Sequence, residues 1–73
     1  STHDLKALVT AGEGHLHQLR AELHEAELQV NLAAGGEAKR VAGLQHTRDA
    51  RAKSVAALDA ELERYRAELR RRE

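Results

Sequence analysis

The chain contains no cysteine, proline, methionine, tryptophan or phenylalanine, and Tyr65 is its only aromatic residue. The absence of cysteine excludes disulfides and thiolate metal sites. The absence of proline removes the residue that most strongly interrupts a helix. No apolar run approaches the roughly 20 residues that a membrane-spanning helix requires, and no signal peptide is visible. We therefore expect a soluble, cytoplasmic (intracellular) protein without a membrane partner.

The residues that are present favour long helices. Alanine, leucine, glutamate and arginine dominate, and 33% of the 73 residues are charged, a composition typical of coiled coils. A chain of this length buries only about 60% of the surface that it exposes when unfolded, so a core of its own is marginal. The sequence begins without methionine and ends inside a charged helical pattern, and we expect a domain of a longer protein.

Gly35 and Gly36 divide the chain near its midpoint. Two glycines cost a helix roughly 2 kcal/mol relative to two alanines, which favours a turn over a continuous helix. We predict an all-α fold, an antiparallel two-helix coiled-coil hairpin with helices at 3–34 and 37–71 and a turn at 35–36. Gly35 would end the first helix and Gly36 would cap the second. The alternative is parallel pairing of helices from different chains, with a flexible Gly-Gly joint.

A seven-residue apolar repeat runs along the first segment and predicts one face of a coiled coil. Its core positions are Leu5, Val9, Gly12, Leu16, Leu19, Leu23, Ala26, Val30 and Ala33. Ser1 and Asp4 have the spacing of a capping box, which predicts that this helix begins at the N-terminus.

Gly12 and Gly14 are the weak point of the first helix. The repeat continues across them unbroken, so we expect a continuous helix with a kink or a close helix approach at Gly12. Thr10 and Glu13 also have capping-box spacing, which leaves a second helix start or a hinge as the alternative.

The second segment carries the same repeat, and the two seams predict how the helices pair. Its core positions are Val41, Leu44, Arg48, Arg51, Val55, Leu58, Leu62, Tyr65 and Leu69. Counting about the glycine pair places residue i opposite residue 71 − i. The matches would be Val30 with Val41, Leu16 with Val55, Val9 with Leu62, and Leu5 beside Tyr65.

The distribution of charge also favours the hairpin. Residues 1–36 hold two basic and five acidic side chains, a net charge of −3, and residues 37–73 hold ten basic and seven acidic ones, a net charge of +3. Unlike charges on the two halves attract. The acidic stretch 22–27 would face the basic stretch 44–49.

Three leucines outside the seams, Leu8, Leu28 and Leu32, would be exposed in a monomer. Several exposed leucines on one small helix indicate a partner surface, and a homodimer that forms a four-helix bundle is the simplest closure. Another helical protein is the alternative partner. The interface residues that we predict are Leu5, Val9, Leu16, Leu19, Leu23, Val30, Val41, Leu44, Val55, Leu58, Leu62, Tyr65 and Leu69.

Arg48 and Arg51 are anomalous, because a charged group in a coiled-coil core is costly unless it is paired. One interpretation is that they extend past the seam and pair with glutamates of the acidic stretch. A second is a buried lock on register between protomers. A third is a site for phosphate, a nucleotide or an acidic partner, because guanidinium groups one turn apart suit bidentate anions.

Five histidines invite a search for metal ligands. His3, His17 and His24 share the outer b position of the heptad. His17 follows Glu13 by four residues, but no HExxH or ExxH pattern completes a site, and the same holds for His46 beside Asp49. We predict no metal and no cofactor, and we interpret the histidines as surface residues that could make association sensitive to pH.

Neither catalysis nor nucleic-acid binding is predicted. Thr47 adjoins His46, but neighbouring helical residues point to different faces and form no nucleophile–base couple. The basic C-terminal end is interleaved with glutamates and lacks stacking aromatics. We predict a non-enzymatic coiled-coil oligomerisation or protein-interaction domain, a scaffold or adaptor. The alternative is a small regulatory module that binds an anionic ligand or acidic partner through Arg48 and Arg51.

Overall fold

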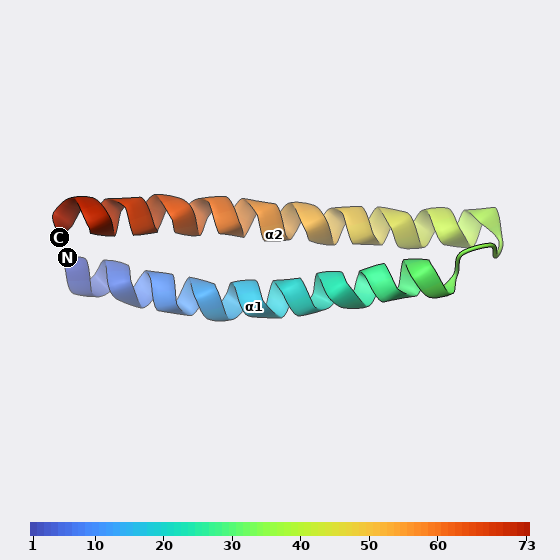
Figure 1. The fold of residues 1–73 in the computed structure, drawn as a ribbon, viewed down its shortest axis with the longest axis horizontal. Helices are drawn as coiled ribbons and strands as arrows, with labels where there is room; N and C mark the ends of the chain where they lie inside the picture. The colour runs from blue at the N-terminus through green and yellow to red at the C-terminus, as the bar shows by residue number, and fades with distance from the viewer.

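Two long helices joined by one turn make up the molecule, and the computed structural model describes residues 1–73. Helix α1 spans Thr2–Leu32 and helix α2 spans Ala38–Arg72. The helices lie side by side and run in opposite directions, so the two chain ends lie together at the end far from the turn (Figure 1). The molecule measures 53 × 15 × 12 Å. The predicted all-helical hairpin is confirmed.

The N-terminal start of α1 follows the predicted capping pattern. The hydroxyl of Ser1 accepts a hydrogen bond from the backbone N–H of Asp4 at 3.2 Å, which satisfies one of the free donors of the first turn. From this cap α1 continues without interruption through Gly12 and Gly14. The second helix start considered near Thr10 therefore does not occur.

The turn is longer than the glycine pair and begins earlier. Helix α1 ends at Leu32, and the N–H of Gly36 donates to the carbonyl of Ala33 at 2.9 Å, closing a four-residue turn. Gly35, third in that turn, has φ of 83°, a conformation that glycine adopts without the steric cost of a Cβ. The cap predicted for the second helix is wrong, because Glu37 occupies the N-cap position and makes no side-chain capping bond.

The helix register differs from the predicted one by three residues. The side chain of Leu62 lies directly over Gly12, so residue i lies level with residue 74 − i and not with 71 − i. The prediction assumed a turn centred on the glycines. Figure 1 shows instead that the first turn of α2 extends beyond the end of α1, and the connecting chain runs along the axis to reach it.

This register gives each seam residue another seam residue as its opposite. Counting from the Gly12–Leu62 contact places Leu16 level with Leu58, and the remaining layers follow in steps of three and four. In the predicted register, Gly12 would have faced Asp59. The repeat places Asp59 outside the seam, so the predicted register would have left Gly12 without a seam residue as its opposite.

Gly12 is the one glycine whose position is packed closely against the other helix. A Cβ built on Gly12 would lie 2.4 Å from Cδ2 of Leu62, which is far closer than real carbon contacts, whereas Gly14 has no atom within 4 Å of its Cβ position. Leu62 exposes 0% of its surface and is the most buried residue of the chain. The heptad repeat therefore continues through Gly12, and the missing side chain allows the two helices to approach closely there.

The two glycines of α1 predict opposite responses to the same substitution. Gly12→Ala is expected to lower the free energy of unfolding, because overpacking costs about 1–3 kcal/mol and exceeds the gain of up to about 1 kcal/mol in helix propensity. Gly14→Ala meets open space and is expected to raise stability by about 0.5–1 kcal/mol. Urea unfolding of both variants measures the difference. Equal gains would show that Leu62 does not pack on Gly12.

Burial is concentrated toward the end of the hairpin that carries the chain termini. Only five of the 73 residues are buried, namely Leu5, Val9, Leu16, Ala26 and Leu62. The other apolar seam residues are half-buried, including those nearest the turn, such as Val30 and Leu44. One seam between two helices cannot enclose its own side chains, so the seam remains open to solvent along its flanks.

Candidate interaction surface

The two long sides of the hairpin differ in character, and one carries a ladder of ion pairs between the helices. Its three pairs are Lys6–Glu73 at 3.6 Å, Glu13–Arg66 at 3.1 Å and Arg20–Asp59 at 3.6 Å. The positions recur every seven residues on each helix, so all three pairs lie beside the seam on the same side. We call these six residues the ion-pair ladder.

The signs in the ion-pair ladder alternate along each helix, and this discriminates between registers. Sliding α2 by one heptad would keep apolar residues opposite one another. It would also oppose Lys6 with Arg66 and Glu13 with Asp59, both like-charge pairs. Each exposed pair stabilises the hairpin little, but the repulsion in a slipped register adds to the loss of attraction. The ladder therefore selects the observed register among those that the apolar repeat allows.

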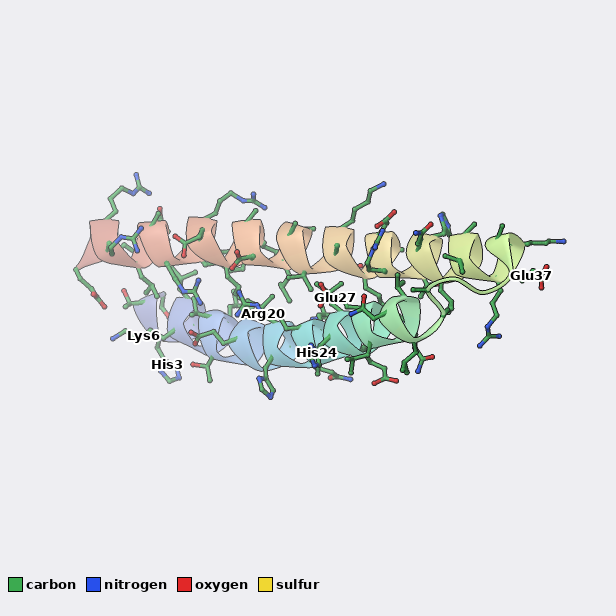
Figure 2. The ribbon with its side chains drawn as sticks, turned by 45° about the vertical axis from the view of Figure 1, so that its right-hand side comes forward. His3, Lys6, Arg20, His24, Glu27 and Glu37 are labelled. Carbon is green, nitrogen blue, oxygen red and sulfur yellow. The ribbon has the colours of Figure 1, made fainter.

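Arg66 is the best-connected member of the ion-pair ladder. Its guanidinium donates to Glu13 of α1 at 3.1 Å and to Glu63 of its own helix at 2.9 Å. The hydrogen bond to Glu13, followed by that to Glu63, raises the pKa of Arg66 above its ordinary value. Figure 2 shows Arg20 and Glu27 along the edge of α1 toward α2 and His3 on the edge away from it. Glu27 is next in the heptad series, but Ala52 stands at the corresponding position of α2.

A double-mutant cycle on Arg20 and Asp59 tests the ladder. Arg20→Glu and Asp59→Arg each place like charges together and are expected to lower the free energy of unfolding. The exchange of both is expected to recover most of that loss, with a coupling of about 0.2–1 kcal/mol at low salt. The coupling should shrink as salt is added. Lys53→Glu, at an exposed position outside the ladder, is the control. A coupling of zero at low salt would contradict the pairing.

The opposite side of the hairpin is hollowed by two grooves. The larger, of about 470 Å³, lies toward the turn and is lined by Gln18, Ala21, Glu22, Glu25, Ala26, Gln29, Leu44, Thr47 and Arg51. The smaller, of about 330 Å³, lies toward the chain ends and is lined by Leu8, Ala11, Gly12, His15, Leu58, Glu61, Leu62 and Tyr65. In heptad terms both open on the side away from the ion-pair ladder, and we call this the groove side.

Arg48 and Arg51 pair with different carboxylates. Arg51 lies at the larger groove, and its guanidinium is 3.4 Å from the carboxylate of Glu22 on α1, one of the glutamates expected to pair with it. Arg48 contacts its neighbour Asp49 at 2.9 Å and no residue of the acidic stretch. Arg48 is half-buried, whereas Arg51 is exposed. Each guanidinium therefore already has a carboxylate partner.

Two of the three leucines outside the seams belong to the groove side. Leu8 lines the smaller groove and is 53% exposed. Leu32, 81% exposed near the turn, shares the heptad position of Gln18 and Glu25 in the larger groove. Leu28, 42% exposed, lies on the outer face of α1 and lines neither groove, although Ala21, one heptad earlier, reaches the edge of the larger one. The exposed apolar side chains thus favour the groove side.

Tyr65 also contributes a polar group to the smaller groove. Its phenol donates a hydrogen bond to the carboxylate of Glu61, one turn earlier on α2, at 2.7 Å. This bond and the charge of Glu61 raise the pKa of Tyr65 above its ordinary value. Sequence reasoning placed Tyr65 in the seam and missed this contact, although the spacing of four residues on a helix could have indicated it.

The remaining polar residues form no cluster of potential metal ligands. The structure contains no group of three or more histidine, cysteine, aspartate or glutamate side chains able to hold a metal ion. His3, His17 and His24 are exposed along α1, and Glu13, the possible co-ligand of His17, is paired with Arg66. His15 lines the smaller groove, a place that sequence reasoning did not assign to it.

The C-terminal turn of α2 has a local charge cluster. The carboxylate of Glu68 accepts hydrogen bonds from Arg71 and Arg72, and these bonds hold the pKa of Glu68 below its ordinary value. A depressed carboxyl pKa stabilises the folded end above the ordinary pKa, and this contribution is lost as the pH falls through the lowered value.

Neither helix has a stretch sufficiently long and apolar to span a membrane. Comparison with known proteins adds no family: no protein-family model matches the chain, and neither a curated protein nor a solved structure gives a significant match.

Proposed function

We propose that the hairpin is a non-enzymatic helical association domain, which serves as a scaffold or adaptor by forming a four-helix bundle with a partner. The observation that supports this most directly is the amount of exposed surface. The chain exposes 5292 Å² and buries only five of its 73 residues. A folded monomer of 8.1 kDa exposes about 4,500 Å² by the usual scaling with mass.

The hairpin thus exposes about 800 Å² more than the scaling with mass gives for a folded monomer. This excess equals the area that one partner contributes to a standard protein–protein interface. A second pair of helices laid on the hairpin would cover surface of this order and enclose the half-buried seam. Association therefore supplies the burial that a chain of this length lacks by itself.

The alternative function, binding of an anion by Arg48 and Arg51, has less support from the geometry. An anion would first have to displace Asp49 from Arg48 and Glu22 from Arg51. The two guanidinium groups also contact different carboxylates and do not converge on one point. We therefore propose association as the function and retain anion binding only as the competing hypothesis.

Sedimentation equilibrium, together with thermal melts over about a hundredfold range of protein concentration, tests the proposal. An associating domain has a midpoint temperature that rises with concentration, because mass action favours the bundle. A monomeric mass with a constant midpoint would overturn self-association. Addition of inorganic phosphate in the same melts tests the competing hypothesis, since a bound anion would raise the midpoint in wild type but not in Arg48→Leu/Arg51→Leu.

A further inference from the structure

The two long sides of the hairpin differ in how much uncovered apolar surface they offer to a partner. On one side the ion-pair ladder already pairs its charges across the seam, and no groove opens there. On the groove side, two hollows of about 470 and 330 Å³ follow one another along the molecule. Leu8 and Leu32 stand exposed beside them. The groove side is therefore the surface that lacks a cover.

The net charges of the two helices decide what can cover it. Helix α1 carries five carboxylates and two basic side chains, a net charge of −3. Helix α2 carries five carboxylates and ten basic side chains, a net charge of +5. At the flanking heptad positions of the groove side, α1 carries three carboxylates and no lysine or arginine, whereas α2 carries three arginines and two carboxylates. A complementary partner therefore presents a basic helix over α1 and an acidic helix over α2. A second copy of the chain presents both.

A second copy can be laid on the groove side with two-fold symmetry in two ways. If the axis runs along the hairpin, α1 lies beside the partner's α2 and both turns lie at the same end. If the axis runs across the hairpin, α1 lies beside the partner's α1 and the turns lie at opposite ends. The second arrangement sets +5 beside +5 and −3 beside −3, and like-charge juxtaposition is costly.

We propose that two copies pack groove side to groove side with both turns at the same end, each α1 lying beside the α2 of the other copy. This inference rests on the proposed function of self-association and specifies its surface and its symmetry. Each helix then has an antiparallel neighbour of opposite net charge both within its own chain and in the partner, as in antiparallel four-helix bundles.

Side-chain size along the groove side agrees with this arrangement. The outer groove-side heptad position of α1 carries, from the N-terminus, Asp4, Ala11, Gln18, Glu25 and Leu32. In the proposed dimer, residue i of α1 lies level with residue 75 − i of the partner's α2, one residue from the register within the hairpin. The residues of α2 at these positions are Arg71, Arg64, Ala57, Ala50 and Gly43. A larger residue faces a smaller one at four levels, and Asp4 faces Arg71 at the fifth. Leu32 meets Gly43, which has no atom within 4 Å of its Cβ position.

Spin labels at the turn distinguish the two symmetries. The chain has no cysteine, so Ala34→Cys, at an exposed position of the turn, provides one labelling site. With both turns at the same end, pulsed dipolar spectroscopy should give a distance of about 20–30 Å, since helices in a bundle lie 8–10 Å apart and the labels add their own length. With turns at opposite ends, the distance should approach the 53 Å length of the hairpin. A long distance would overturn the proposed symmetry and leave self-association standing, whereas a monomer would overturn both.

Charge substitution of the exposed leucines tests the surface independently. Leu8→Glu and Leu32→Glu should each raise the dissociation constant of the dimer at least about tenfold, because each places a carboxylate inside the interface. Leu28→Glu, on the outer face of the same helix, is the matched control and should leave the constant unchanged. Circular dichroism checks that each variant remains helical. Equal effects of the three substitutions, or an effect of Leu28→Glu alone, would contradict the groove side as the interface.

Discussion

Leu62→Ala is expected to lower the free energy of unfolding by about 2–5 kcal/mol, the range for truncating a buried leucine. Leu62 exposes none of its surface, and it fills the space left by the missing side chain of Gly12. Alanine at position 62 would leave a gap opposite a glycine, which has no side chain to fill it. Because a core in a chain of about 70–80 residues supplies only about 3–5 kcal/mol in total, the variant should be largely unfolded.

Leu28→Ala is the matched control for this prediction. It removes the same atoms from the outer face of α1, where the side chain is 42% exposed, and should cost less than about 1 kcal/mol. Urea unfolding followed by circular dichroism, at one fixed protein concentration, compares the two variants with wild type. Equal losses at the two positions would mean that burial at Leu62 does not control the stability of the hairpin.

The packing of the buried Leu62 on Gly12 shows what the heptad repeat could and could not predict. The apolar residues that the repeat assigned to the seam are all buried or half-buried, because burial of apolar side chains repeats every three or four residues on a helix. The repeat also carried the helix through Gly12, where a local argument from glycine would have broken it. The partner of Leu62 was nevertheless predicted to be Val9, because the register was counted from the turn.

Register depends on features that the apolar repeat does not contain. A turn of unknown length shifts one helix along the other, and here α2 begins its first turn beyond the end of α1 (Figure 1). The missing information was present in the charges flanking the seam. Lys6, Glu13 and Arg20 alternate in sign at seven-residue intervals, as do Asp59, Arg66 and Glu73 in the opposite sense. Matching these two series would have selected the observed register.

The grooves could not be predicted from the sequence, because a groove depends on how far apart two half-buried helices lie. The pattern of residues did indicate that Leu8 and Leu32 would be exposed, and they are. It did not indicate that they lie on the side away from the ion-pair ladder. That placement, which carries the proposed interface, follows only once the register assigns each flanking residue to one side.

Arg48→Leu/Arg51→Leu is expected to stabilise the chain by about 1–2 kcal/mol. In the observed register Arg51 stands level with Leu23 and Arg48 with Ala26, so leucines there would extend the apolar seam. Burying about half of a leucine side chain contributes on the order of 1 kcal/mol, less what the arginine stems already bury. The ion pairs that are lost lie at the surface, where such pairs contribute little. Thermal melts at fixed concentration should show a midpoint several degrees higher.

The matched control is Lys53→Leu/Arg70→Leu, two exposed basic residues of the same helix outside the seam, the ion-pair ladder and the groove side, which should leave the midpoint nearly unchanged. A stabilised seam variant that keeps the mass of the wild-type assembly would mean that the two arginines are tolerated in the seam and specify nothing. A stabilised variant with a different mass would assign them the selection of oligomeric state, the role that polar core residues play in other coiled coils. A loss of stability would contradict the prediction and show that the pair between Arg51 and Glu22 holds the turn half of the hairpin together. In that half only Ala26 is buried.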